Sequence, residues 1–447
     1  MAANRTAESG FGSGRALWRP FLRLSGLNIL SNITVPLAGL VDVALLGHLA
    51  EIRHLAGVAL ASLLFDYLYW TFGFLRMSTT GLTAQAIGRG DRDEASHVLY
   101  RAVAIGLAFG LAIVLLQQPL RELGFRFLSG SEAVEAAGRD YFTARVWAAP
   151  VALVNLAFAG WFLGRGESGR LLSLALVANL SNVLLSYYLI VHRQLAATGA
   201  GLGSALAQCL MAVVAVLMTW RSNESARRPW RTTFADVFDW PRVRQLFALN
   251  RDILIRTVCL VSTFALFTNW SALMGTAVLA ANSILLRLLT LASYLIDGAA
   301  FATESLAGYL LGRDDKGRIR QLRRMALAGG LGLAAAVTLV WTAVPRSLLA
   351  ILTSHADVAD LAISYLPWLS LVTLLGASAY ILDGYFLGRT EGAILRRSML
   401  WSTLAVFLPV AGLALVQRSN PLLWLSLALF MAARTGTLWS AAVRAER

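Results

Sequence analysis

Charged residues are scarce in this chain of 447 residues: Asp, Glu, Lys and Arg together make up 14%, whereas hydrophobic residues make up 57%. A water-soluble domain of this length needs more polar residues to cover its surface, so the composition excludes a soluble globular protein. Apolar runs of roughly 20 residues recur along the whole chain, and each is long enough to cross a hydrocarbon layer about 30 Å thick. The sequence therefore predicts an all-α integral membrane protein that crosses the bilayer many times.

The apolar runs predict twelve transmembrane helices. Their centres lie near Val35, Phe65, Gly106, Val151, Leu180, Met211, Thr263, Leu289, Ala335, Leu374, Phe407 and Leu429. We expect five parts along the chain: an N-terminal tail over 1–23, an N-lobe of six helices over 24–220, a linker over 221–250, a C-lobe of six helices over 251–440 and a C-terminal tail over 441–447.

Cysteine and histidine are also scarce. The two cysteines, Cys209 and Cys259, both lie in apolar runs, which indicates neither a disulfide framework nor a metal site. The five histidines lie near span ends or in loops: His48, His54, His97, His192 and His355. Because no His/Asp or Cys/His cluster has a spacing suited to catalysis, we expect a protein that is not an enzyme and holds no metal or cofactor.

The net charge of +14 is distributed unevenly. With the N-terminus in the cytoplasm, 28 of the 39 basic residues lie in the two tails and the cytoplasmic loops, and only Arg76, Arg287 and Arg434 lie within spans. This asymmetry follows the positive-inside rule and predicts that both termini are cytoplasmic. The basic residues thus orient the chain in a lipid bilayer, and nucleic-acid binding is not expected because no basic stretch is interleaved with exposed aromatic residues.

Two loops of the chain occur twice. AGWFLGRGESGR, which begins at Ala159, resembles DGYFLGRTEGAI, which begins at Asp383; IGRGDRDEA, from Ile87, resembles LGRDDKGRI, from Leu311. Both pairs are 224 positions apart, which is half the length of the chain. We infer that the sequence contains two copies of a six-span unit. Because six is even, both copies enter the membrane from the same side and form parallel repeats.

An ionisable residue, Asp42, lies inside the first apolar run, between Val41 and Val43. A charge at such a depth costs about 2.5–3.5 kcal/mol on insertion scales, so it is a candidate functional residue. Burial away from water favours the protonated form of a carboxyl group, which makes Asp42 a candidate proton carrier. The alternative is a carboxylate that an arginine such as Arg76 holds permanently ionised.

Four polar residues in spans of the same half are candidates for a proton- or cation-coupling site with Asp42: Asn155, Asn182, Ser186 and Ser204. Asn182 and Ser186 are four residues apart and share a helix face. Each residue alone is more often an interhelical hydrogen bond than part of a site. Only convergence on Asp42 would make them a site.

The second half has its own candidate polar site: Asp252, Arg256, Asp297, Glu304 and Asp383. Asp297 and Glu304 are seven residues apart, two turns along one helix face. The positions 224 residues before Asp297, Glu304 and Asp383 carry no charge, so the scaffold was duplicated and the charges were not. For Asp252 and Arg256, one turn apart, the alternative is a local ion pair.

Five segments resemble the multidrug and toxic compound extrusion (MATE) family, and specifically its DNA-damage-inducible protein F branch. They are SNITVPLAGLVD (31–42), FLRMSTTGLTAQA (74–86), GSEAV (130–134), LNRDI (249–253) and LIDGAAFATES (295–305). The resemblance covers nearly the whole chain. It implies two six-helix lobes in a V, and export of cationic or amphipathic compounds in exchange for H⁺ or Na⁺. It also matches Asp42 to the first-helix aspartate of the family and places Asn155 and Asn182 beside it.

The chain departs from the family pattern at one position. Where many members have a second aspartate, in the pattern N-x-x-x-D, this sequence reads NVLLS, so Ser186 replaces the carboxylate. A Na⁺ site needs several oxygen ligands and benefits from negative charge. The replacement therefore favours H⁺ as the coupling ion, although a cation site in the C-lobe that uses Asp252, Glu304 or Asp383 stays open.

We therefore expect a monomeric multidrug efflux transporter of the inner membrane, without a cofactor, that exchanges organic cations or amphipathic compounds for protons by alternating access. Two alternatives stay open: Na⁺-coupled antiport, and a flippase for lipids or polysaccharide precursors on a related scaffold. The flippase would need a large cationic cavity, and only Arg76, Arg287 and Arg434 lie within the spans.

Overall fold

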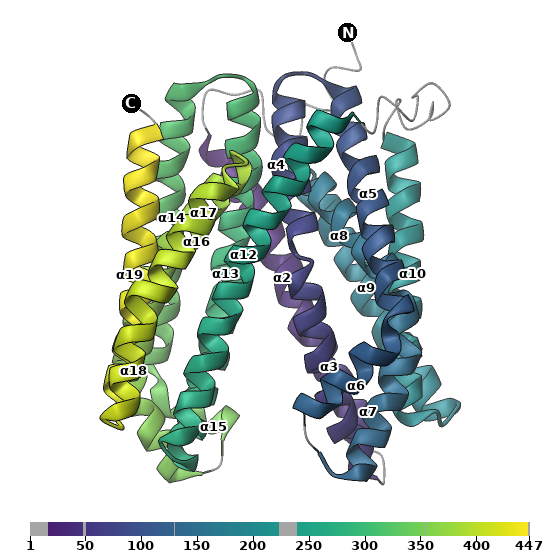
Figure 1. Ribbon diagram of the computed structural model, residues 1–447, viewed down its shortest axis with the longest axis vertical. Coiled ribbons are helices and arrows are strands. Elements are labelled where there is room, and N and C mark those ends of the chain that lie inside the picture. The colour runs from purple at the N-terminus through teal and green to yellow at the C-terminus, as the bar shows by residue number, and fades with distance from the viewer. Residues whose placement is uncertain (1–16, 48–50, 129, 223–238, 354, 446–447) are drawn as a thin grey trace. The chain divides into compact units, whose positions relative to one another are not determined.

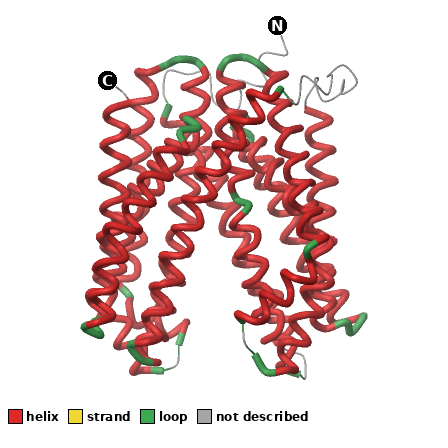
Figure 2. Tube along the Cα trace, viewed as in Figure 1, coloured by secondary structure: helices red, strands yellow, loops and turns green. Residues whose placement is uncertain are grey.

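The computed structural model describes residues 17–47, 51–128, 130–222, 239–353 and 355–445, and within these ranges it leaves out the side chains of residues 35–38, 40–43, 127 and 222. The described secondary structure is helical throughout these ranges, with short loops between the helices (Figures 1 and 2). The prediction of an all-α chain is confirmed.

Eleven described segments are long and apolar enough to cross a membrane. They are Ile52–Gly88, Arg92–Leu115, Glu132–Gly164, Ser168–His192, Ala196–Arg221, Trp240–Leu273, Thr276–Gly312, Lys316–Ala343, Ala356–Gly388, Gly392–Val416 and Asn420–Ala445. Each contains one of the predicted centres from Phe65 to Leu429. The remaining predicted centre, Val35, lies in helix α2 (Trp18–Gly47), and its side chain is outside the described residues.

The described residues pack into two compact units. The first, which we call the N-terminal unit, comprises Leu30–Phe247. Besides the later part of α2 it contains α3 (Ile52–Thr71), α4 (Phe74–Gly88), α5 (Arg92–Leu115), α6 (Gln117–Phe127), α7 (Glu132–Arg145), α8 (Ala149–Gly164), α9 (Ser168–Tyr187) and α10 (Ala196–Ser222). A 3₁₀ turn (Val146–Ala148) joins α7 to α8, and a π-helical turn (Tyr188–His192) follows α9.

The second, the C-terminal unit, comprises Met1–Ile29 and Ala248–Arg447. Its helices are the start of α2, most of α12 (Trp240–Leu273), α13 (Thr276–Gly312), α14 (Lys316–Ala343), α15 (Pro345–Leu352), α16 (Ala356–Gly388), α17 (Gly392–Trp401), α18 (Leu408–Val416) and α19 (Asn420–Ala445), with a π-helical segment (Ser402–Phe407) between α17 and α18. The boundary between residues 247 and 248 lies inside the predicted linker, 221–250. The other boundary lies inside α2, between residues 29 and 30, whereas the N-lobe was predicted to begin at residue 24.

The packing of two helix pairs confirms the internal duplication. Helix α8 packs on α4 in the N-terminal unit, and α16 packs on α13 in the C-terminal unit. Gly160 on α8 lies against the backbone oxygen of Arg76, and Gly384, 224 positions later, lies against the backbone oxygen of Ala300, which is 224 positions after Arg76. At both glycines the neighbouring backbone leaves no room for a Cβ. The repeated glycines therefore let two helix backbones approach closely in each unit.

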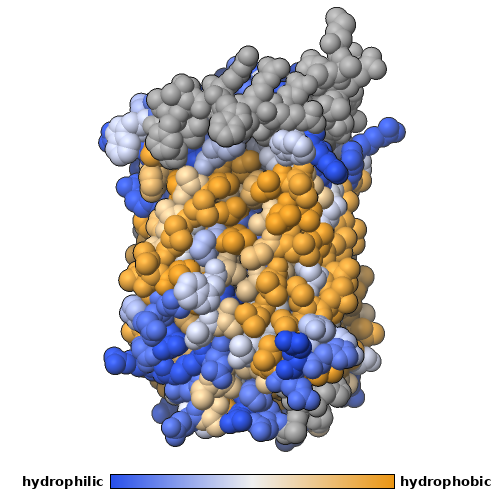
Figure 3. Space-filling model, turned by 90° about the vertical axis from the view of Figure 1, so that its right-hand side faces the viewer, coloured by the Kyte–Doolittle hydropathy of each residue, from blue (hydrophilic) through white to orange (hydrophobic). Residues whose placement is uncertain are grey.

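Apolar side chains cover the outward faces of the membrane-crossing helices. Leu176, Leu180 and Leu184, each one turn apart on α9, have 49%, 62% and 59% of their surface exposed. The face drawn in Figure 3 has hydrophobic side chains across its middle and hydrophilic side chains toward its lower end. Such an apolar band suits contact with lipid, so the described chain is a multi-pass membrane protein.

A glycine substitution tests the close helix packing. Gly384→Ala places a methyl group against the backbone of Ala300, which cannot rotate away, so we expect the thermal unfolding temperature in detergent to fall by an amount equivalent to about 1–3 kcal/mol. The matched control is Gly412→Ala, whose Cβ meets no atom within 4 Å, and we expect no loss of stability there. Equal melting temperatures for the two variants would contradict the close approach of α16 to α13.

Candidate functional site

Hydrogen bonds between polar side chains join α8, α9 and α10 in the N-terminal unit. The Nδ2 atom of Asn155 on α8 donates to Oε1 of Gln208 on α10 at 2.8 Å and to its backbone oxygen at 2.9 Å. Asn182 on α9 donates to Oγ of Ser204 at 3.1 Å. Ser204 and Gln208 are four residues apart on α10 and therefore share a face. Asn155 and Asn182, both predicted, thus bind the same face of α10: Asn182 through the predicted Ser204, and Asn155 through Gln208, which no sequence pattern had singled out.

A second hydrogen bond links this region to α2. Asn179, one turn before Asn182, donates to Oγ1 of Thr34 at 2.7 Å, and the Thr34 hydroxyl donates in turn to the backbone oxygen of Ser31. Thr34 lies on the helix that carries Asp42, two turns earlier in the chain. The side chain of Asp42 is outside the described residues, so its place relative to these amides stays a prediction.

Ser186 lies where α9 packs closely against Gly203 of α10. Its side chain is completely buried, and a Cβ on Gly203 of α10 would come within 2.7 Å of its Oγ atom. No described atom forms a hydrogen bond with this hydroxyl group. The position where the family pattern has a carboxylate therefore holds a small neutral side chain in a tightly packed contact, which leaves no space for a larger acid without a shift of α10.

A cluster of buried charges lies in the C-terminal unit. Oδ2 of Asp383 on α16 accepts hydrogen bonds from Arg256 on α12 and, at 2.5 Å, from Arg434 on α19. Asp383 is 4% exposed and Arg434 is fully buried. A buried guanidinium group is tolerated only with a close carboxylate partner. Asp383 therefore fastens α12 and α19 to α16.

Further groups surround this cluster. The guanidinium carbon of Arg434 lies 5.6 Å from the ring centre of Tyr380 and 5.5 Å from that of Phe430. Asp297 on α13 interacts electrostatically with Arg256 and with Tyr380. The positive charges of Arg256 and Arg434 thus offset the negative charges of Asp383 and Asp297. The cluster therefore offers little net negative charge to an additional cation. The sequence alone could have predicted that Arg434 has an acidic partner, because a guanidinium group inside a span needs a carboxylate nearby.

The remaining predicted residues of the second half lie elsewhere. Asp252 accepts hydrogen bonds from Arg396 on α17 and from the adjacent Arg251, at 3.2 Å. The alternative of a local ion pair between Asp252 and Arg256 is therefore wrong, because each has a partner on a different helix. Glu304 is completely buried where α13 packs on α16, and its backbone oxygen lies against Gly388. The five residues thus occupy three separate places.

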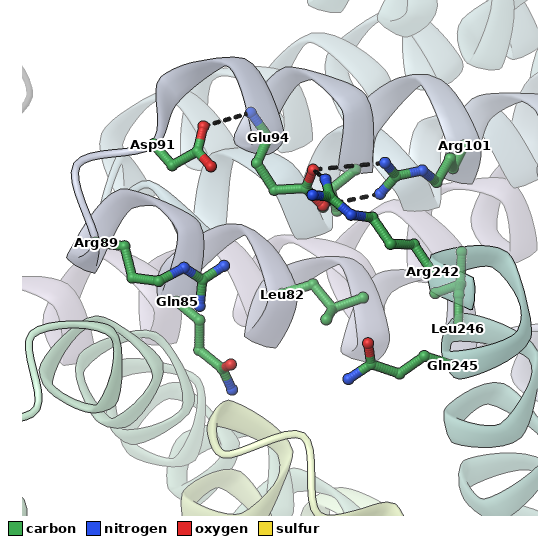
Figure 4. Close-up of a pocket in the computed structure, with 10 residues that line it drawn as sticks. Leu82, Gln85, Arg89, Asp91, Glu94, Arg101, Arg242, Gln245 and Leu246 are labelled. Carbon is green, nitrogen blue, oxygen red and sulfur yellow. Dashed lines mark hydrogen bonds and ion pairs between the residues drawn. The ribbon is translucent and has the colours of Figure 1, made fainter. Parts of the chain in front are cut away.

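A cavity of about 260 Å³ opens in the N-terminal unit between α4, the start of α5 and the start of α12. Figure 4 shows Glu94 on α5 between Arg101, which donates to it at 2.9 Å, and Arg242 on α12. Asp91 caps α5 by accepting from the backbone N–H of Glu94. In the second copy Asp315 caps α14 in the same way, but Arg318 stands where Glu94 would be. Of these two equivalent positions, the one in the first copy thus binds the start of α12, through the ion pair between Glu94 and Arg242.

Comparisons with known proteins agree on one family. The sequence model of the MatE family matches residues 28–188 and again 253–411, one match in each half. The chain is 34% identical over 429 residues to DNA damage-inducible protein F of Escherichia coli, covering 94% of this chain and 90% of that protein. It is 31% identical over 314 residues to the probable multidrug resistance protein NorM of Bradyrhizobium diazoefficiens, covering 66% of this chain and 64% of that protein.

Solved structures show the same fold. The outward-facing conformation of a multidrug resistance MATE family transporter of the MOP superfamily matches with a TM-score of 0.84 at 18% identity, covering 95% of this chain and 96% of that chain. A MOP superfamily transporter from Pyrococcus furiosus, described as having a binding pocket of reverse polarity, matches with a TM-score of 0.85 at 17% identity and 95% coverage of both chains.

Removal of one carboxylate tests the role of the buried charge cluster. Asp383→Asn leaves Arg256 and Arg434 buried without an anionic partner, so we expect a loss of about 3–5 kcal/mol in stability, seen as a lower melting temperature and yield in detergent. Asp357→Asn removes an exposed carboxylate at the start of α16 and should stay within about 0.5 kcal/mol of the parent. A fully stable Asp383→Asn variant that has lost a sodium response would instead identify Asp383 as a cation ligand.

Proposed function

Since the chain belongs to the MATE (multidrug and toxic compound extrusion) family of multidrug efflux transporters, in its DNA-damage-inducible protein F branch, we propose that it exchanges protons for organic cations or amphipathic compounds across the inner membrane. In this proposal the protein works as a monomer with both termini in the cytoplasm, and Asp42 carries the proton. The gradient supplies the driving force, so the chain needs no bound cofactor.

The observation that most supports an N-terminal coupling site is the polar connection from α2 to α10. Thr34 on α2 accepts from Asn179 on α9, and Asn182, one turn further along α9, donates to Ser204 on α10. Amide and hydroxyl groups that hydrogen-bond across helices can respond to a nearby carboxyl group, because its ionised form only accepts hydrogen bonds whereas its protonated form also donates one. A change in the charge of Asp42 would therefore alter how α2 packs on α9 and α10.

Two features favour H⁺ over Na⁺ as the coupling ion. Sodium prefers several oxygen ligands with negative charge among them. In the N-terminal unit the second carboxylate of the family pattern is replaced by Ser186, which is packed against Gly203. In the C-terminal unit Asp383 is already neutralised by Arg256 and Arg434. A single titrating acid can carry a proton without any such ligand set.

The proposed cycle follows from where the proton is gained and lost. When the site is open to the acidic exterior, Asp42 takes up a proton, and the neutral carboxyl group no longer attracts a cationic substrate, which leaves. When the site is open to the cytoplasm, Asp42 releases the proton and the carboxylate attracts the next substrate. Coupling arises because proton and substrate compete for one charge state or favour different conformations.

The flippase alternative needs several exposed positive charges within the membrane to hold a pyrophosphate group. Arg434 is fully buried against Asp383, and Arg76 is half-buried and already has an interaction partner. Of the three arginines predicted within the spans, Arg287 on α13 is the exposed one. This distribution favours the export of cations over the movement of a polyanionic lipid.

Transport in proteoliposomes tests the proposal directly. A fluorescent organic cation should be driven out by a proton gradient alone and not by a sodium gradient alone. Asp42→Asn cannot change its charge, so we expect gradient-driven efflux to fall to the level of empty vesicles while the protein still inserts. Asp357→Asn serves as the matched control and should transport like the parent protein.

Two outcomes would count against this mechanism. Unimpaired efflux by Asp42→Asn would remove Asp42 as the proton carrier, and efflux under a sodium gradient alone would make Na⁺ the coupling ion. A sodium result would point to Asp252 and Glu304, because these are the predicted site acids of the C-terminal unit that lie outside the Asp383 cluster.

A further inference from the structure

Helix α3 has two opposite faces with different surroundings. Its buried face, with Gly57, Ala61 and Phe65, lies on the side where α3 packs against α7. The other face consists of Leu63, Asp66, Tyr67 and Trp70, whose spacing places them one or two turns apart along a single stripe. All four are exposed in the structure, Tyr67 at 46% and Trp70 at 53%. We call this stripe the acidic-aromatic face.

The acidic-aromatic face lies deep in the membrane. Helices α3 and α4 together form the crossing segment Ile52–Gly88. At about 1.5 Å per residue, Asp66 lies about 21 Å from its Ile52 end and about 33 Å from its Gly88 end. A hydrocarbon layer about 30 Å thick, centred on this segment, therefore contains Asp66. An ionisable residue at that depth generally faces a protein interior or a water-filled cavity rather than lipid, which favours water beside the exposed stripe.

The crossing segment is interrupted next to this stripe. Helix α3 ends at Thr71 and α4 begins at Phe74, and the N–H groups of Phe72 and Gly73 donate to the backbone oxygens of Tyr69 and Trp70. The two helices therefore meet at a kink beside Trp70. The corresponding stretch of the second copy, Thr276–Gly312, is one continuous helix, so the two copies differ at this point.

The carboxylate of Asp66 is available to a ligand. Its nearest source of positive charge is Arg145 on α7, which interacts with it electrostatically. Arg145 itself donates to the hydroxyl of Tyr141 at 2.5 Å and stacks on the ring of Phe65, with 4.7 Å between its guanidinium carbon and the ring centre. Among the described residues, none forms a hydrogen bond or an ion pair with the carboxylate of Asp66. The acid is therefore held near the exposed stripe without being neutralised by direct contact.

We propose that Asp66, Tyr67 and Trp70 bind the positively charged part of organic-cation substrates. The carboxylate supplies the opposite charge, and the two aromatic rings supply cation–π contacts and a flat apolar surface. The positions 224 residues after Asp66, Tyr67 and Trp70 carry Thr290, Leu291 and Tyr294, and the position 224 residues after Leu63 carries Arg287, so the equivalent positions of the second copy hold no acid. This inference rests on the proposed function and divides the work between two acids: Asp42 carries the proton and Asp66 selects the charge of the substrate.

Equilibrium binding of tetraphenylphosphonium, a permanent organic cation, to the purified full chain in detergent tests the proposal. We expect Asp66→Asn to weaken binding about tenfold or more, because the opposite charge is lost while the shape is kept. Asp66→Glu keeps the charge and should bind within about threefold of the parent, whereas Trp70→Ala should weaken binding about threefold to tenfold. Asp357→Asn is the matched control for loss of an exposed carboxylate, and melting temperatures establish that each variant is folded.

A second measurement separates substrate recognition from coupling. Proton-driven efflux of an uncharged amphipathic dye should persist in Asp66→Asn and fail in Asp42→Asn. Parent-like binding of tetraphenylphosphonium by Asp66→Asn would overturn the inference and leave the proposed function intact. Equal loss of charged and uncharged transport in a folded Asp66→Asn variant would also overturn it. Failure of the parent protein to bind or export any cation would instead reject the proposed function together with the inference.

Discussion

The structure depends on how an apolar protein accommodates charge where water is scarce. A carboxylate or guanidinium group in that environment must be paired, face water or become neutral. The described charges follow the first two solutions: Asp383 is paired with Arg256 and Arg434 in the C-terminal unit, and Asp66 lies on an exposed face of α3. The proposed role of Asp42 uses the third. One physical constraint thus leads to three different roles for an aspartate.

The duplicated scaffold separates what a helix pair needs for packing from what a transporter needs for chemistry. Gly160 and Gly384 recur because the facing backbones approach so closely that no side chain fits in either unit. The polar side chains do not recur, since a hydrogen bond or ion pair requires both partners and each copy has kept different partners. The N-terminal unit holds neutral amides around α10, whereas the C-terminal unit holds the balanced arginine–aspartate cluster. The two units therefore share a packing frame but differ in their polar side chains, and the proposed coupling role is assigned to the N-terminal unit alone.

Several partners could not be found from spacing along the chain. Asp252 and Arg256 are one turn apart, yet their ion-pair partners, Arg396 and Asp383, come from helices more than a hundred residues away. Gln208 binds Asn155 because α8 and α10 meet, and no local pattern distinguishes it from any other polar residue in a span. Asp66 was equally hidden, because exposure is a property of a helix face and only packing of α3 on α7 shows which face is left open.

The sequence by itself determined the membrane class, the positions of the spans, the duplication and the family, because each of these follows from hydrophobic length, charge distribution or repeated local motifs that act over a few turns of chain. Only the tertiary structure decided which side chains meet, which charges are neutralised and where α3 and α4 separate. The physical reason is that the free energies of ion pairing and burial depend on the distances between helices. Those distances result from packing contacts among residues that are far apart in the chain.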